Sequence, residues 1–244
     1  MNARLVVFVN IMLLILLTPA GLLSATAQPS DALPRRVTAF TSPLAVESYF
    51  PDPNPILSNL SVRQALAFCT DRWALAKAAY PTLTDPEIDA LMMDSFFSKD
   101  HWAYTEATTK YPYDLTQGQT LLEQAGWTLP QGETYRVNAA GEELALVLTT
   151  TVADFRYAWA EVLESQWLTC GIRLVRLHAP GDWVFGETTG IARRDFEITG
   201  FSWVADADPQ IAQFYACDQI PSALNAWQGV NYMGWCNSTA SAEA

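Results

Sequence analysis

Basic residues are scarce in this chain of 244 residues. Lysine and arginine together number 14 against 26 aspartates and glutamates, which gives a formal net charge of -12 at pH 7. Nucleic acids and anionic lipid surfaces attract basic proteins, so the charge balance excludes both from the partners that we expect. A cationic or zwitterionic ligand suits the chain better, although most of these carboxylates also form a solvated surface that aids solubility.

Metal-binding and nucleophile motifs are also missing from the sequence. It has two histidines, His101 and His178, and four cysteines, none of them in a C-x-x-C pair. A structural zinc site needs four such ligands close together, so we expect no metal. Neither histidine accompanies a serine in a G-x-S-x-G setting, and we predict no cofactor and no enzymatic activity.

The only long hydrophobic segment lies at the N-terminus. Leu5–Leu17 is apolar apart from Asn10 and follows the positive charge of Arg4. It is shorter than the roughly 20 residues that span a bilayer as a helix. Small residues at 25–27 complete the pattern of a secretion signal. We therefore predict that residues 1–27 are cleaved and the protein is exported, with a retained membrane anchor as the alternative.

The rest of the chain is predicted to contain one folded region. Half of all residues are hydrophobic and 16% are charged, a composition that can bury a core. Prolines concentrate in residues 28–56, which favours an extended lead-in. Residues 57–237 then form the folded lobe, and 238–244 a polar tail.

Helices are predicted in the first half of the folded region. Ser61 caps a helix that ends before Pro81, and Asp85–Met93 forms a second one. Asp114 caps a third helix, which Gly126 ends. The charged residues of the first helix, Arg63 among them, are expected to form ion pairs within the scaffold.

A strand–helix–strand pattern follows. Leu144–Leu148 is an apolar strand, Asp154–Thr169 is helical, and Ile172–Leu177 is a second strand. Strands joined this closely through a helix are expected to be parallel, with a right-handed crossover. Residues 196–201 alternate as a third strand. The fold class predicted from these elements is α/β.

Two aspartates follow this third strand in the stretch GFSWVADADPQ (200–210). In open α/β sheets, binding loops gather at the carboxyl ends of the strands, so Asp206 and Asp208 are candidate site residues. They could also serve only to order the loop. A glycosidase-like carboxylate pair is a less favoured alternative, because no other catalytic group accompanies them.

Four cysteines allow three complete pairings, and their spacing alone does not choose among them. Export permits disulfides. Cys217 and Cys236 lie in a loop-rich end of the chain, where a disulfide would constrain irregular backbone. Cys69 and Cys170 fall in helical patterns, and we expect both to be buried free thiols.

Four stretches in a fixed order resemble one known family. They are LSVRQALAFCTDR (60–72), YPYDLTQGQTLLEQAGW (111–127), FEITGFSWVADADP (196–209) and CDQIPSALNAWQGVNYMGWCN (217–237). With them the chain resembles the extracellular solute-binding proteins of family 5, the peptide, dipeptide and nickel receptors of bacterial ABC importers. The resemblance implies a lobe like that of type II periplasmic binding proteins, with a mixed, partly parallel sheet flanked by helices. It is incomplete relative to the two-lobed family.

The resemblance also implies a ligand site. Asp206 matches the aspartate that pairs with the α-ammonium group of a peptide, and Asp208 is expected to order the turn. Trp203, Val204 and Ala205 line the pocket beside Asp206. Asn231 and Tyr232 are expected in the pocket wall.

The implied partners are a peptide or similar small solute, a permease in the membrane and a missing first lobe. The implied location is the periplasm or the exterior of the cell envelope. The alternative is a secreted, non-transport remnant of a broken gene. Whether the ligand is a dipeptide, a longer peptide, a nickel complex or a sugar stays open.

Overall fold

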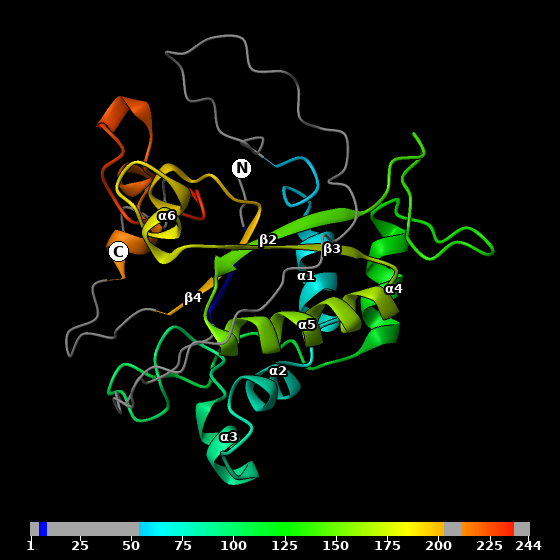
Figure 1. Ribbon diagram of the computed structural model, residues 1–244, viewed down its shortest axis with the longest axis horizontal. Helices are drawn as coiled ribbons and strands as arrows, with labels where there is room; N and C mark the ends of the chain where they lie inside the picture. Colours follow the sequence, from blue (N-terminus) through cyan, green and yellow to red (C-terminus); the bar gives the residue numbers. More distant parts are fainter. Residues whose placement is uncertain (1–4, 9–53, 203–210, 237–244) are drawn as a thin grey trace, which may run out of the picture. The chain divides into compact units, whose positions relative to one another are not determined.

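The computed structural model describes residues 5–8, 54–202 and 211–236 (Figure 1). Most of the predicted secretion signal, the proline-rich lead-in and the polar tail lie outside these residues. The helices are α1 (Leu60–Phe68), α2 (Arg72–Ala79), α3 (Asp85–Leu91), α4 (Leu115–Gln124), α5 (Asp154–Thr169), α6 (Gly181–Val184) and α7 (Ala212–Tyr215), with short 3-10 turns at Gly190–Arg193, Cys217–Gln219 and Ala223–Asn225. The strands are β1 (Leu5–Phe8), β2 (Ala145–Thr151), β3 (Arg173–Ala179) and β4 (Ile198–Phe201).

The first predicted helix is two helices, so the prediction of one continuous helix was wrong. Asn59 caps α1 by accepting a hydrogen bond from the backbone N–H of Ser61, which is itself inside the helix. Asp71 then caps α2 by accepting from the N–H of Ala74. Because an N-cap residue has extended backbone, the aspartate between the two apolar stretches ends one helix and begins the next.

The later helices follow the sequence signals closely. Asp114 caps α4 by accepting from the N–H of Gln117, and Gly126 adopts a positive φ of 87° just past its end. Such a conformation suits glycine because it has no Cβ. Helix α5 spans Asp154–Thr169, the range that the sequence predicts.

The sheet has four strands in the order β1-β4-β2-β3, and all of its strand pairs are parallel. The β2–β3 pair is the predicted strand–helix–strand unit, with Leu146 opposite Leu174. Strand β4 pairs with β2 through Leu148↔Ile198 and Thr149↔Thr199. Two isolated antiparallel bridges involve Val137. The predicted strands and their parallel pairing are confirmed.

Helices α1, α2, α4 and α5 pack on one face of the sheet, where Leu146, Leu148, Trp159 and Leu163 belong to the larger hydrophobic core (Figure 1). A smaller hydrophobic cluster contains Phe196 and Phe201 together with residues of α6 and of the C-terminal loops.

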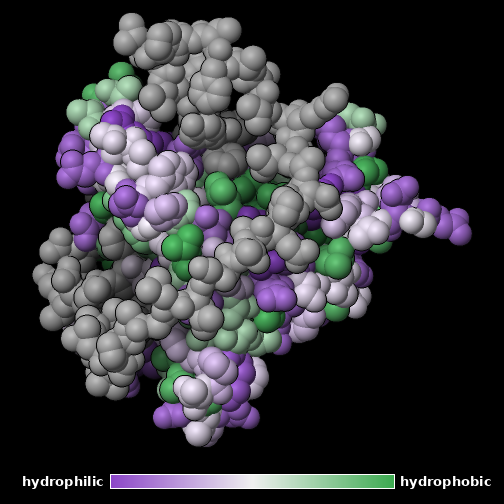
Figure 2. All heavy atoms as spheres, viewed as in Figure 1, coloured by the Kyte–Doolittle hydropathy of each residue, from purple (hydrophilic) through white to green (hydrophobic). Residues whose placement is uncertain are grey.

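Figure 2 shows exposed hydrophobic residues near the middle of the view, over the region of β2 and β3 in Figure 1. Leu177 of β3 is one exposed apolar side chain of this sheet.

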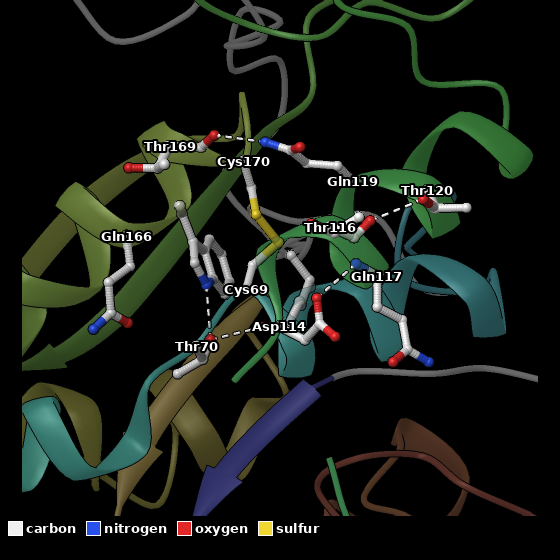
Figure 3. Close-up of a disulfide and its surroundings, with 12 residues drawn as sticks. Cys69, Thr70, Asp114, Thr116, Gln117, Gln119, Thr120, Gln166, Thr169 and Cys170 are labelled. Atoms are coloured by element: carbon white, nitrogen blue, oxygen red, sulfur yellow. Dashed lines mark hydrogen bonds between the residues drawn. A yellow bond between two sulfur atoms is a disulfide. The ribbon is translucent and has the colours of Figure 1, made fainter. Parts of the chain in front are cut away.

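A disulfide joins Cys69, at the end of α1, to Cys170, at the end of α5 (Figure 3). The expectation of two free thiols was therefore wrong: both cysteines cap helices whose ends converge in the core. Gly118 of α4 makes this approach possible, because a Cβ there would lie 2.5 Å from Cys69 Sγ.

Hydrogen bonds around this disulfide link the same three helices (Figure 3). The indole Nε1 of Trp167 donates to the Thr70 hydroxyl over 2.9 Å. The side-chain amide of Gln119 donates to the carbonyl of Thr169 over 3.1 Å. The disulfide is thus part of a closely packed junction of α1, α4 and α5.

The second disulfide joins Cys217 to Cys236, as predicted. It closes the loop-rich C-terminal segment, whose other fixed points include the buried side chain of Asn231. The amide of Asn231 donates to the carbonyls of Ala216 and Trp235 over 3.0 and 2.8 Å.

Strand β1 lies inside the predicted secretion signal. Its backbone pairs with β4, with Leu5 opposite Ile198 and Phe8 opposite Phe201. Cleavage after residue 27 stays a prediction, and it would leave this edge of β4 without β1. Within the described part of the chain, no helix combines the length and the apolar character needed to cross a bilayer.

We expect the two disulfides to contribute unequally to stability. Cys69 and Cys170 are 101 residues apart, whereas Cys217 and Cys236 are 19 apart. In the chain-entropy model, loops of these sizes correspond to roughly 4–5 and about 3 kcal/mol. The double variant Cys69→Ala/Cys170→Ala should lower the free energy of unfolding in urea more than Cys217→Ala/Cys236→Ala. A larger loss in the second variant would contradict this order.

Candidate functional site

The candidate site is the edge of the sheet where β2, β3 and β4 end. Because these strands are parallel, their carboxyl ends share this edge. The turn from β2 into α5, the turn from β3 into α6 and the chain that leaves β4 at Ser202 all begin there. The arrangement brings together three connections that are far apart in the sequence.

Arg156 connects two of these strand ends. Its guanidinium Nη1 donates to the Thr150 hydroxyl over 3.0 Å and also to the carbonyl of Gly200. The Thr150 hydroxyl in turn donates to the same Gly200 carbonyl over 3.0 Å. Arg156 lies near the N-terminus of α5, so the helix that follows β2 fixes the last residues of β4 before segment 203–210.

Burial affects the charge of this arginine and its neighbour. Desolvation lowers the pKa of Arg156, and Tyr80 partly opposes that shift. Burial also raises the pKa of Tyr80 to about 12, against the lowering effect of Arg156. At neutral pH the phenol is therefore neutral, and the guanidinium stays charged because arginine is not deprotonated in proteins. Arg156 thus contributes a fixed positive charge to the described strand ends.

His178 is the polar side chain at the end of β3. Its ring stacks on Tyr157 of α5 with centroids 3.8 Å apart, and Nδ1 lies 3.0 Å from the carbonyl oxygen of Thr151. With Nδ1 as the donor, Nε2 is an acceptor, and it is buried without a partner among the residues that the structure describes. Desolvation by burial lowers the pKa of His178, and the nearby Arg176 and Arg156 add to that effect.

Gly200 is required by the packing behind the strand ends. A Cβ at this position would lie 2.7 Å from the ring of Trp159, which is buried in α5. The missing side chain lets α5 approach β4 closely enough for Arg156 to reach the strand. A larger residue at 200 would push the helix and its arginine away.

The predicted ligand residues Trp203, Val204, Ala205 and Asp206, together with Asp208, lie outside the described residues. Their attachment point is described: β4 ends at Phe201, so the strand exit expected from the sequence is confirmed.

Tyr232 and Asn231 lie in the C-terminal loop. The ring of Tyr232 packs edge-on against Phe201 with centroids 6.4 Å apart, which places it beside the end of β4. Asn231 is fully buried and uses its amide N–H groups within the loop. Their role in a pocket wall stays a prediction.

Arg156 and His178 were not recognised as site residues from the sequence. One signal could have found Arg156: an arginine in the first turns of a helix that directly follows a buried strand. No local pattern indicates that His178 stacks on Tyr157, because those residues come from different elements. Among residues 54–202 and 211–236, no three histidine, cysteine or acidic side chains are close enough to hold a metal ion.

Residues 13–221 match the model described as bacterial extracellular solute-binding proteins, family 5 Middle. Among curated relatives, a dipeptide-binding protein of Escherichia coli is 22% identical over 191 residues, which cover 74% of this chain and 30% of that protein. The chain thus spans about a third of the length of its relatives.

Two solved structures show the same fold. An oligopeptide-binding protein of Thermus thermophilus, solved with a pentapeptide, aligns with a TM-score of 0.64 and 22% identity over 76% of this chain and 32% of that one. An oligopeptide-binding protein of Bacillus subtilis, solved with a nonapeptide, aligns with a TM-score of 0.63 and 20% identity over 78% of this chain and 35% of that one. The fold is that of one lobe of a type II periplasmic binding protein.

We predict that Arg156→Met loosens the exit of β4. The variant loses both hydrogen bonds from the guanidinium, and such bonds from a charged group contribute about 1.5–3 kcal/mol. Urea unfolding should show a loss of that order, and amide exchange should rise at residues 199–202. The control is Arg173→Met, whose exposed ion pair with Glu143 should be worth less than about 1 kcal/mol. Equal losses in both variants would contradict the role of Arg156.

We also predict a pH dependence of stability that comes from His178. Burial lowers its pKa in the folded state, so the unfolded chain binds the proton at a higher pH. Stability therefore falls as the pH falls from above about 6.5, the unfolded value, through the folded pKa. Unfolding in urea between about pH 7.5 and 5.5 should show a smaller decline for His178→Gln than for the unmodified protein. Parallel pH profiles would refute this assignment.

Proposed function

The chain belongs to the bacterial extracellular solute-binding proteins of family 5, and from this premise we propose that it is the substrate-binding component, or part of one, of an ABC importer that captures peptides. The observation that carries the proposal is the end of β4 at Phe201, at the sheet edge where β2 and β3 also end and where ligands bind in open α/β sheets. In the sequence, the residues 203–210 follow this strand end directly.

Asp206 is the proposed anchor for the ligand. Its carboxylate and a peptide's α-ammonium group would form charge-assisted hydrogen bonds, which are stronger than neutral ones once water is excluded. The adjacent Trp203, Val204 and Ala205 would line the site, and an extended peptide backbone can pair with protein backbone as an added strand. The scarcity of basic residues also favours a ligand with a positive end.

The described part of the site supports the proposed role of Asp206, because hydrogen bonds hold the end of β4 from which the chain continues to that residue. Arg156 and Thr150 both donate a hydrogen bond to the carbonyl of Gly200, which lies three residues before the proposed binding segment begins at Trp203. A binding group gives affinity when its backbone is already in place, because less conformational freedom is lost on binding. The rigid strand end therefore favours a preformed position for the anchor.

The chain matches only part of the length of its relatives, and this bears on how tightly it can bind a peptide by itself. It covers 30% of the dipeptide-binding relative, so a two-lobed receptor would need a second lobe to complete the pocket. A carboxylate that faces water attracts an ammonium group only weakly. We propose that this chain by itself binds peptides with an affinity no tighter than the millimolar range.

The partners and location follow from the same proposal. The ligand-bound receptor would dock on a permease in the membrane, outside the cytoplasm, after export directed by residues 1–27. A carrier has no reaction to catalyse, so the proposal includes no enzymatic activity. A secreted remnant with no transport role is the alternative, and the neighbouring genes distinguish the two.

We expect weak but specific peptide binding at the carboxyl edge. In a titration of the isotope-labelled chain with millimolar Ala-Phe, amide signals of Thr151, His178 and Ser202 should shift, because these residues surround the strand exits. N-acetyl-Ala-Phe, which lacks the ammonium group, should bind about two- to fivefold more weakly, as expected for a solvent-exposed ion pair. Asp206→Asn should weaken binding of Ala-Phe by a similar factor.

The matched control is Asp218→Asn, an acidic residue of the C-terminal 3-10 turn at Cys217–Gln219, which should bind Ala-Phe like the unmodified chain. Micromolar binding by the chain alone would contradict the proposed need for a second lobe. Equal binding of the acetylated and free peptides would refute the role of Asp206.

A further inference from the structure

A cavity of about 370 Å³ lies on the helical side of the molecule. Its walls come from α1, α2 and α5, from residues 93–96 and 109–111, and from Tyr215 at the end of α7. Its volume falls within the range of small-molecule sites. None of its lining residues belongs to the strand exits, so it is separate from the described part of the site proposed above.

The cavity wall holds the guanidinium of Arg63, which has no carboxylate partner among the described residues. Arg63 Nη1 donates to the carbonyls of Leu57 and Ser58 over 2.7 and 3.2 Å, which fixes the side chain. Within the described residues, Nη2 and Nε of Arg63 have no acceptor, and no acidic oxygen lies within 4 Å. The ion pair expected for Arg63 from the sequence is therefore not found among the described residues.

The carboxylate of Asp94 in the cavity wall is shared by two other cations, Arg72 in the wall and Lys110 beside it. Arg72 donates to Asp94 Oδ1 over 2.6 Å, and Lys110 donates to Asp94 Oδ2 over 2.7 Å. Both carboxylate oxygens of Asp94 thus accept hydrogen bonds from other cations, and Asp94 does not pair with Arg63. In a chain of net charge -12, this cavity has a surplus of positive charge. A half-buried cation without a counter-ion favours binding of an anion.

The remaining wall is aromatic. Tyr111, Trp167 and Tyr215 all face the cavity, and the ring of Tyr111 packs edge-on against Phe68 with centroids 5.4 Å apart. Burial lowers the pKa of Arg63, and the nearby Tyr111 opposes that shift, which is consistent with the phenol lying close to the guanidinium. Flat rings beside a guanidinium fork suit a planar carboxylate attached to an aromatic body.

We propose that this cavity is a second binding site, which takes a small aromatic monocarboxylate with its carboxylate on Arg63 and its ring among Tyr111, Trp167 and Tyr215. The volume is equivalent to about a dozen waters of roughly 30 Å³ each, which suits an acid with about ten heavy atoms. The same guanidinium could instead receive an acidic side chain from another protein segment, and the test below separates these occupants.

The probe is phenylacetate, titrated into the full chain by calorimetry, with phenylacetamide as its neutral counterpart of the same shape. Phenylacetate should bind saturably, and the amide at least tenfold more weakly, because only the acid pairs with the guanidinium. Arg63→Gln should reduce phenylacetate binding at least tenfold. Arg173→Gln is the matched control, since that arginine pairs with Glu143 outside the cavity, and it should leave binding unchanged.

A second variant tests the proposal independently in case Arg63→Gln does not fold. Ala67 lines the cavity, so Ala67→Phe should fill it and abolish binding while Arg63 keeps its charge. Circular dichroism and urea unfolding would establish that each variant is folded. Equal affinities for acid and amide, or unchanged binding in either cavity variant, would overturn the proposal. Absence of saturable phenylacetate binding would also overturn it and favour an acidic protein segment as the occupant.

Discussion

The parallel pairing of β2 with both β3 and β4 is the constraint on which the rest of the structure depends. Each pairing aligns a carboxyl end with its neighbour, so the connections after residues 151, 179 and 201 leave from one edge. A parallel pair needs a crossover segment, and α5 provides it between β2 and β3. The candidate site is therefore a consequence of strand direction, before any side chain is considered.

Helix α5 serves the core and the site at once. Its buried side, with Trp159, Leu163 and Trp167, covers the sheet, and its N-terminal turns present Arg156 and Tyr157 to the strand ends. Gly200 of β4 affects both the core and the site. Because it has no side chain, the Trp159 ring packs directly against it, and this contact sets the distance between α5 and β4. Packing in the core thereby determines where the proposed binding segment begins.

The far end of α5 is fixed in a different way. There the disulfide to Cys69, the close approach at Gly118 and the hydrogen bond between Trp167 and Thr70 join it to α1 and α4. The same α1 carries Arg63, whose guanidinium is fixed by two backbone carbonyls rather than by a carboxylate. A rigid helical layer thus holds a preformed cavity on one side and supports the strand exits on the other.

The sequence by itself determined several local elements, because helix caps and hydrophobic periodicity act over a few residues: α4, α5, β2, β3 and β4 lie where Asp114, Gly126 and the apolar runs place them. It also indicated the family, through motifs in a fixed order, and favoured the Cys217–Cys236 pair, whose partners share one loop-rich segment. Only the tertiary structure decided the Cys69–Cys170 disulfide, the contact of Arg156 with Gly200 and the cavity at Arg63. Each of these brings together residues that are far apart in sequence, and their distance depends on how helices and strands pack rather than on any local pattern.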